Sequence, residues 1–594
     1  MALVANADKR AVSEAKSAWR AHQKAVKSGE VKTNYSIGLA GSFTVESLEP
    51  FIGSTILASG FKPTIKIAAY NQLFQVCLNH TNHFSGKLDC IIIIWRIEEL
   101  LANEFKDFIS GKPEALQKAK DTLAEFSAAI SSLRESFKGF LIVSTPPYPQ
   151  DTTTFVNWNN SSTGAAFFFK TLSLKWAELL AAKEQVYILD LDLLQRISGM
   201  DSIFDARKWY LYKQPYKDLF LLQLGLAISR LFNARYMVPK KCLVMDCDNT
   251  LWGGIVGEDG LEGIQLGQGF PGSVFQDIQQ MALNWREQGI SLALLSKNNE
   301  GDVKQVFLNH DGMILKWQHI SAWQINWQPK HENIKEIAKD LNIGVDSLVF
   351  LDDNPYEIAQ MQEYCPKVTS IQVPEDPAFY PAMLAGITCF DKLETTTEDL
   401  KRASMMQAEQ DREQVRNSMS SQTFLESLDL RVTFFTPQQQ HIERVAQLIN
   451  KTNQFNLTTV RRNSEEVQAI FADTSYRIYC IQIDDRFGEY GLTGVAIIKL
   501  DIAKKVSHLD TFLLSCRVLG RGVEGAFISA IAKDMDSLGI TSMKGSFIAT
   551  KKNSPAKSFL PDHGFTLQKS TNWLATIADI PPTPEYITIK ALLG

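Results

Sequence analysis

The sequence has no apolar stretch long enough to cross a membrane. Its longest apolar run, residues 90–95, is far shorter than the ~20 residues that a membrane-spanning helix needs. The first 20 residues mix charged residues with alanines and lack the apolar core of a signal peptide. We therefore expect a cytoplasmic protein with no membrane partner.

Paired cysteines and blocks of basic residues are also missing. The eight cysteines are scattered, and no two have the CxxC spacing of redox or zinc sites. Most lie in apolar segments, as expected for core residues in a reducing compartment. The net charge is −5 and no basic run is present, which argues against nucleic acid as a partner.

The chain is long enough for several domains. At ~100–200 residues per domain, 594 residues indicate three or four units. The second block, residues 236–395, is predicted to be α/β. Residues 396–424 are charged and rich in Met and Gln, which indicates a helical connector. Residues 425–594 mix strands with amphipathic helices. Residues 1–235 alternate helical stretches with apolar strands at 35–39, 64–69, 89–95, 139–144 and 186–191. The predicted class is multidomain α/β, with a doubly wound parallel sheet first and a mixed α+β domain last.

An acid pair follows the predicted strand at residues 242–245. Asp246 and Asp248 are spaced i and i+2, so their side chains point to the same side at the carboxyl end of the strand. This edge of an open α/β sheet is where ligands bind. With Mg²⁺ between them, one carboxylate can attack a phosphoryl group while the other shuttles a proton.

Three later segments supply partners for this pair. Ser296 ends an apolar strand and can hold a phosphoryl oxygen, and Lys330 precedes a helical pattern at 331–337, where its ammonium offsets negative charge. Asp352 and Asp353 follow a third apolar strand. Because clustered carboxylates repel one another without a divalent cation, these hard oxygen ligands indicate a Mg²⁺ site.

The ordered set resembles the haloacid-dehalogenase (HAD) superfamily of phosphotransferases. In that family the first aspartate accepts the phosphoryl group and the second is the general acid and base; here these are Asp246 and Asp248. A serine and a lysine, here Ser296 and Lys330, steady the transferring group. The implied Mg²⁺ ligands are Asp246, Asp248, Asp352 and Asp353, and either of the last two could bind the metal directly.

The first block contains a Gly-x-Ser turn, with Ser42 directly after a predicted strand. The turn resembles that of SGNH-type hydrolases, but the Asp-x-x-His dyad of that family is here Asp205-Ala-Arg-Lys208, and Arg96 stands where an oxyanion element is expected. Lysine cannot replace imidazole as the base at neutral pH without a large pKa depression. We therefore expect a degenerate SGNH-like domain for binding or scaffolding. Residues 205–210 either line a binding surface or form a buried salt bridge with packed aromatic side chains.

The last block contains a strand, the sequence Arg517-Val-Leu-Gly520-Arg-Gly522, and then a helix over 523–538. Glycines let backbone N–H groups approach an anion at a helix N-terminus. The pattern resembles the coenzyme A loop of GNAT acyltransferases, which implies that Arg517, Gly520 and Gly522 bind coenzyme A or phosphopantetheine. A plain glycine-rich turn is the alternative.

Together, the three blocks resemble the FkbH-like proteins of polyketide pathways over nearly the whole chain. The resemblance rests on Asp-Cys-Asp-Asn-Thr-Leu-Trp-Gly-Gly at residues 246–254 and on the strings at 253–260, 295–298 and 451–459. It implies that a glyceryl group passes from 1,3-bisphosphoglycerate to the phosphopantetheine thiol of an acyl carrier protein, with release of phosphate. About 45 residues separate Asp248 from Ser296, too few for a large lid domain, so we expect an open site.

Cys247 is the candidate acyl carrier, because a thiol can hold the glyceryl group as a thioester. Strand alternation points it away from the two aspartates, however, and buried thiols are usually inert. Direct attack by the phosphopantetheine thiol is the alternative. Two other activities stay open: a HAD phosphatase for a small phosphorylated metabolite, and a GNAT-type acyl-CoA-dependent N-acyltransferase.

Overall fold

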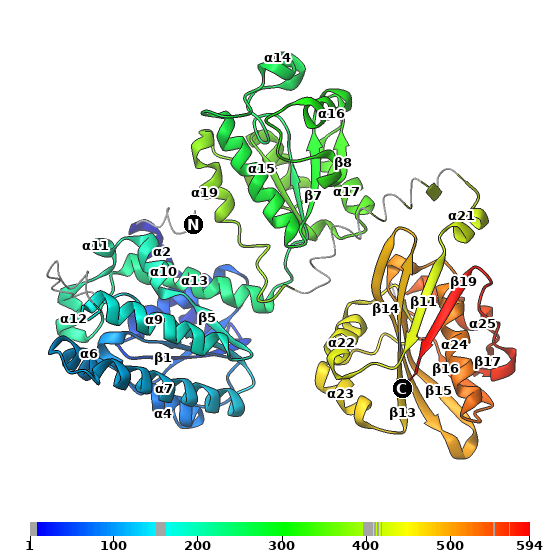
Figure 1. The fold of residues 1–594 in the computed structure, drawn as a ribbon, viewed down its shortest axis with the longest axis horizontal. Helices are drawn as coiled ribbons and strands as arrows, with labels where there is room; N and C mark the ends of the chain where they lie inside the picture. Colours follow the sequence, from blue (N-terminus) through cyan, green and yellow to red (C-terminus); the bar gives the residue numbers. More distant parts are fainter. Residues whose placement is uncertain are drawn as a thin grey trace. The chain divides into compact units, whose positions relative to one another are not determined.

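The chain folds around three separate sheets (Figure 1). The computed structural model describes residues 9–149, 162–395, 419–550, 553–569 and 571–593, together with residues 408, 412, 415 and 416. The chain divides into two compact units, of which the first holds most of residues 1–395 and the second holds residues 396–594. Within the described ranges, no helix combines the length and apolar character needed to cross a membrane.

The first part is a five-stranded sheet between helices. Its strands are β1 (Tyr35–Gly41), β2 (Pro63–Ile67), β3 (Cys90–Ile94), β4 (Phe140–Ser144) and β5 (Val186–Leu189). Its helices are α2 (Lys9–Lys27), α3 (Glu49–Ala58), α4 (Leu73–Leu78), α5 (Ile97–Leu100), α6 (Ala102–Ile109), α7 (Ala115–Ser136), α9 (Ala165–Ala181), α10 (Leu191–Ser198), α11 (Met200–Ile203), α12 (Ala206–Tyr212) and α13 (Asp218–Tyr236). The strand order is β2-β1-β3-β4-β5, and every neighbouring pair is parallel.

Strand β3 shows why this sheet is covered on both faces. Ile91 and Ile93 pack into one apolar cluster with α7 and α9, whereas Ile92 and Ile94 pack into another with α3 and α13. A strand buried on both faces is apolar at every position, because successive side chains alternate between the faces. The predicted doubly wound sheet is therefore confirmed, with all five strands present.

The second part is another five-stranded sheet. Its strands are β6 (Cys242–Met245), β7 (Ser291–Ser296), β8 (Ile320–Ile325), β9 (Leu348–Asp352) and β10 (Thr369–Gln372). Its helices are α14 (Val256–Gly263), α15 (Gly272–Glu287), α16 (Glu300–Asn309), α17 (Lys330–Asp340), α18 (Pro355–Tyr364) and α19 (Tyr380–Ala385). The order is β10-β9-β6-β7-β8, and β9 runs parallel to both β6 and β10. Strands β6, β7 and β9 are buried along their full length, as their apolar sequences predict.

The third part is a nine-stranded, largely antiparallel sheet. Its strands are β11 (Leu430–Phe435), β12 (Phe455–Asn456), β13 (Tyr476–Asp485), β14 (Gly488–Asp501), β15 (Val506–Leu514), β16 (Ser542–Ser546), β17 (Thr566–Lys569), β18 (Asn572–Thr576) and β19 (Ile587–Leu592). Its helices are α21 (Ser421–Ser427), α22 (Ile442–Lys451), α23 (Ser464–Ala472), α24 (Val523–Ser537) and α25 (Phe559–Asp562). The order is β17-β18-β16-β15-β14-β13-β11-β19, and β12 pairs with β15. The predicted connector, residues 396–424, lies mostly outside the described residues.

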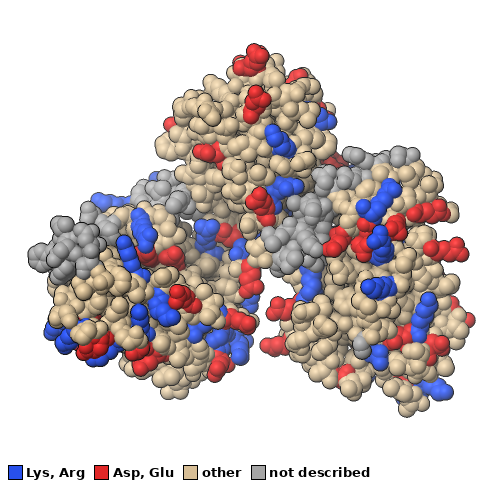
Figure 2. Space-filling view, in the orientation of Figure 1, with Lys and Arg blue, Asp and Glu red and all other residues tan. Residues whose placement is uncertain are grey.

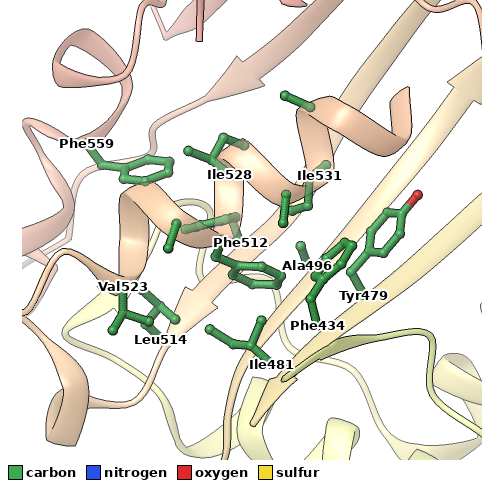
Figure 3. Packing of buried hydrophobic residues seen from close by; sticks show 14 of the residues in the cluster. Phe434, Tyr479, Ile481, Ala496, Phe512, Leu514, Val523, Ile528, Ile531 and Phe559 are labelled. Atoms are coloured by element: carbon green, nitrogen blue, oxygen red, sulfur yellow. The ribbon is translucent and has the colours of Figure 1, made fainter. Parts of the chain in front are cut away.

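Alternating residues of β13 divide the core of the third part. Ile478 and Cys480 pack with α22 and α23, whereas Tyr479 and Ile481 pack with α24 on the other face. On the α24 side, Phe512 stacks against Phe559 at a ring-centroid distance of 4.5 Å (Figure 3). Helices therefore cover both faces, which confirms the mixed α+β fold.

On the face that Figure 2 shows, charged residues do not separate by sign. On the face shown in Figure 2, Lys and Arg lie interspersed with Asp and Glu over each part. This distribution agrees with the small net charge of −5.

Candidate active site

The acid pairs meet at the carboxyl end of the second sheet. Strands β6 and β9 are neighbours in parallel register, with Met245 opposite Leu351, and the Asp246 N–H donates to the Leu351 carbonyl at 3.0 Å. Asp246 follows β6 directly and Asp352 is the last residue of β9. Because parallel strands end at the same edge, the two carboxylates lie side by side.

Three carboxylates form one group at this edge. Asp246, Asp352 and Asp353 each have an oxygen within 4.8 Å of the others, and the first two side chains are buried. Burial and the charge of Asp246 raise the pKa of Asp352 to about 7, and the same causes raise the pKa of Asp353. Three oxygen ligands that repel one another are the donor set that a hard divalent cation such as Mg²⁺ requires.

Lys330 is the cation that the structure places among these acids. It begins α17 and is buried, and its Nζ lies 3.0 Å from Asp246 Oδ1 and 2.6 Å from Asp352 Oδ2. Burial alone would lower its pKa, but the two carboxylates outweigh burial and raise the pKa above the ordinary lysine value. The ammonium therefore stays charged and can offset charge on a transferring phosphoryl group.

Asp248 lies outside the three-carboxylate group. Its Oδ1 accepts hydrogen bonds from Trp252 Nε1 at 2.9 Å and from the Val256 N–H at 3.1 Å, and its Oδ2 accepts from Asn298 Nδ2 at 2.8 Å. Because donors hold both oxygens, this arrangement does not support its side chain as a metal ligand, contrary to our expectation. Burial nevertheless raises its pKa, which suits a group that gives and takes a proton.

Two asparagines support the site, although no spacing rule singles them out in the sequence. Asn298 is buried and holds Asp248, as above. Asn249 has a left-handed φ of 52°, its Oδ1 accepts from the Gly254 N–H at 2.9 Å, and its side chain hydrogen-bonds Asp353. Asparagine tolerates this backbone region better than most residues. Its presence directly after the predicted strand was therefore the sequence feature that could have indicated a left-handed turn.

Cys247, which lies between Asp246 and Asp248 in the sequence, is fully buried. Burial, then the charges of Asp246 and Asp248, raise the pKa of its thiol well above the ordinary value, and a hydrogen bond with Ser296 lowers it only in part. Ser296, also buried, thus contacts the thiol. A protonated thiol with 0 % exposure is a poor nucleophile, so the geometry disfavours Cys247 as acyl carrier.

A cavity of about 400 Å³ adjoins the acidic group. Asp353 lines it, together with aromatic, amide and acidic side chains, which include Phe275, Gln265, Gln372, Glu375 and Tyr380. Gln265, Gln372 and Glu375 are exposed, so the cavity opens to solvent there. A substrate can reach Asp353 from this side.

In the first part, Ser42 lacks the partners of a hydrolase nucleophile. It is fully buried; its Oγ donates to Glu99 at 3.2 Å and accepts from the Arg96 N–H at 3.0 Å. Lys208 instead bonds Asp218 at 2.8 Å, while the Trp209 ring lies 5.0 Å from the Arg96 guanidinium. The Lys208–Asp218 pair is about one-third exposed and Tyr210 is exposed, so the pair is not the buried salt bridge of the second alternative, and a binding role of residues 205–210 stays a prediction.

In the third part, the glycine loop has the backbone expected of it. Gly520 and Gly522 have φ of 72° and 75°, and α24 begins at the next residue. Arg517 Nε donates to Ser515 Oγ at 3.2 Å. The role of Arg517, Gly520 and Gly522 in binding phosphopantetheine or coenzyme A stays a prediction.

Strand β12 occupies the edge at the end of β15, the strand that precedes this loop. Strand β12 pairs with the end of β15, with Phe455 opposite Leu514 and Asn456 opposite Leu513. The buried Asn553 donates to the Asn456 carbonyl at 3.0 Å and holds β12 there. Strand β12 therefore belongs to the sheet beside this loop, and the acyl-CoA-dependent alternative stays open.

Among solved structures, the chain is similar to a bacterial protein that contains a phosphatase domain. It is the N-terminal part of the protein BF1531 from Bacteroides fragilis, which contains a phosphatase domain and is complexed with Mg; the identity is 26 % and the TM-score 0.56, over 64 % of this chain and 99 % of that chain. The two chains share the α/β fold over this length. No protein-family model matches the sequence, and no curated protein matches it.

A second match covers a smaller share of the chain. A putative acetyltransferase of the GNAT family from Desulfovibrio desulfuricans covers 25 % of this chain at 13 % identity, with a TM-score of 0.21. That score is too low to carry a conclusion about the third part.

Proposed function

We propose that the second part is a Mg²⁺-dependent phosphatase or phosphotransferase with Asp246 as nucleophile. The observation that carries the proposal is the group formed by Asp246, Asp352 and Asp353 around the ammonium of Lys330. The similar structure from Bacteroides fragilis, which contains a phosphatase domain with Mg, supports the choice of metal. Bound there, Mg²⁺ would neutralise the carboxylates and polarise a phosphoryl oxygen.

The residues define a two-step transfer. An oxygen of Asp246 attacks phosphorus, and the bond from phosphorus to the leaving oxygen breaks while Asp248 gives that oxygen a proton. Water or an alcohol then attacks the aspartyl phosphate and gives a proton to Asp248, while the bond from phosphorus to the Asp246 oxygen breaks and frees the carboxylate. Lys330, which contacts Asp246, offsets negative charge in both steps.

We further propose that the physiological reaction is glyceryl transfer from 1,3-bisphosphoglycerate to the phosphopantetheine thiol of an acyl carrier protein. The resemblance to FkbH-like proteins supports this reaction. The thiol attacks the acyl carbon, the carbon–oxygen bond to the acyl phosphate breaks, and that phosphate leaves with the thiol proton. The site at Asp246 then removes the second, ester phosphate by the two-step transfer described above. Because Cys247 is buried and protonated, we favour direct attack by the carrier thiol over a relay through Cys247.

Intact-mass spectrometry of a phosphopantetheinylated carrier protein tests this proposal. With 1,3-bisphosphoglycerate and Mg²⁺, we expect wild-type protein to add a glyceryl group. Asp246→Asn should remove the ester phosphate at least ~100-fold more slowly, as for a lost nucleophile, so that the carrier keeps a phosphoglyceryl group. Cys247→Ala should still load the carrier. Asp277→Asn, an exposed aspartate of α15, is the matched control and should behave as wild type.

Two results would contradict these expectations separately. Unchanged removal of the ester phosphate by Asp246→Asn would exclude Asp246 as the nucleophile. Loss of loading by Cys247→Ala would support transfer of the glyceryl group through Cys247. A phosphatase for a small metabolite is the second candidate, favoured by the solvent-open cavity beside Asp353. In that case phosphate release from small phosphate esters would proceed equally with and without the carrier.

A further inference from the structure

The cavity beside Asp353 is placed to receive the part of a substrate that is not transferred. Asp353 both lines the cavity and belongs to the three-carboxylate group. A group bound in the cavity therefore lies against Asp353, whose carboxylate adjoins that of Asp246. The volume of about 400 Å³ suits a small organic group.

The charged residues of the cavity are all acidic. Among the described residues that line it, Asp353 and Glu375 carry carboxylates, and Lys, Arg and His do not occur. A second phosphate needs cationic or N–H donors, and it is repelled by carboxylates a few ångströms away. Even with Asp353 neutralised by a cation, Glu375 leaves the cavity negative.

The remaining lining is apolar or carries amides. Phe275 and Tyr380 contact each other edge-on at a ring-centroid distance of 5.9 Å, and the Tyr380 hydroxyl donates to the Asn249 carbonyl at 2.8 Å, which fixes this wall. Gln265 and Gln372 present side-chain amides at the exposed rim. A Cβ on Gly253 would lie 2.8 Å from Gln265 Oε1 and 2.9 Å from the Phe275 ring, so the wall depends on glycine there.

We infer that this cavity binds the alcohol part of a phosphate monoester, and that this alcohol is uncharged, with hydroxyl or amide groups beside apolar ones. The inference rests on the proposed phosphotransfer at Asp246, and it limits the class of substrate that this reaction accepts. A donor with two phosphates, such as 1,3-bisphosphoglycerate, has to keep its second phosphate outside the cavity. Glu375 is then the residue that discriminates by charge.

A pair of ligands that differ only in the second phosphate tests the inference. 3-Hydroxypropyl phosphate and propane-1,3-diyl bisphosphate are titrated calorimetrically, with Mg²⁺, into the Asp248→Asn protein, which keeps the three-carboxylate group. We expect the monophosphate to bind about tenfold more tightly, because the bisphosphate meets Glu375. Glu375→Lys should abolish or invert this preference. Glu363→Lys, the same charge reversal at an exposed position of α18 outside the cavity, should keep it.

The outcomes separate the inference from the proposed function. Equal or tighter binding of the bisphosphate, no binding of either ligand, or a preference that Glu375→Lys leaves unchanged would overturn the inference. Phosphate release from 3-hydroxypropyl phosphate is then measured with wild-type protein and Mg²⁺. Absence of release together with the expected binding preference would refute the phosphatase and leave the cavity assignment standing.

Discussion

The ionisation of Asp352 makes cation binding at the acidic site depend on pH. Its pKa is raised to about 7 by burial and by Asp246, whereas Lys330 and the Asn354 N–H oppose this rise. A carboxyl group must be ionised to bind a cation, so protons and Mg²⁺ compete for it. Below about pH 7 Asp352 is mostly protonated, and Mg²⁺ has to displace its proton. Above that pH the carboxylate is mostly ionised and can bind Mg²⁺ directly.

We therefore predict that the Mg²⁺ affinity of the wild-type protein falls as the pH is lowered through about 7, the pKa of Asp352. One displaced proton gives at most a tenfold loss per pH unit, measured by calorimetric titration with Mg²⁺. Asp352→Asn should bind more weakly with a flatter pH profile, and Asp277→Asn should follow wild type. An affinity that stays constant between about pH 5.5 and 8 would show that this carboxyl group does not take part.

One buried side chain, that of Asn553, helps to hold strand β12. Asn553 donates to the carbonyls of Asn456 and Ile548, both at 3.0 Å, and accepts from the Thr550 N–H at 2.7 Å. A buried amide with three partners is costly to remove, because the groups left behind lose their hydrogen bonds. The short β12 therefore persists through tertiary contacts rather than through its own length.

Asn553→Ala should destabilise this region by roughly 1–3 kcal/mol, the cost of unpaired buried polar groups. Hydrogen exchange followed by mass spectrometry should show faster exchange at residues 455–458. Asn572→Ala removes an exposed asparagine of the same domain and serves as control. If exchange at these residues is unchanged in Asn553→Ala, β12 is held by other contacts.

At the level of the whole chain, the proposed cation site lies entirely within one compact unit. Asp246, Asp352 and Asp353 all belong to the first unit, and residues 396–594 belong to the second. A ligand stabilises only the unit whose folded state binds it. Mg²⁺ should therefore act on the two units differently.

Scanning calorimetry checks this expectation. Mg²⁺ at ~100 times its dissociation constant should add ~2.7 kcal/mol to the unfolding free energy of the first unit and leave the second transition in place. Asp246→Asn should lose most of the shift, because it removes one ligand of the group. A shift of both transitions, or of neither, would contradict a site confined to the first unit.

The sequence by itself determined where the strands lie and which acids follow them. The apolar runs before Asp246 and Asp352 are unbroken because those strands are buried on both faces, so local pattern and final structure agree. The fold class of each part follows from the same alternation of strands and helices.

Only the tertiary structure decided which of these acids gather and what surrounds the others. Asp352 and Asp353 lie with Asp246, Asp248 is held by Trp252 and Asn298, and Cys247 is sealed from solvent. The pairing of β12 with β15 and the acidic cavity also join segments far apart in the chain. Such contacts depend on packing between distant elements, which periodicity and spacing along the chain do not encode.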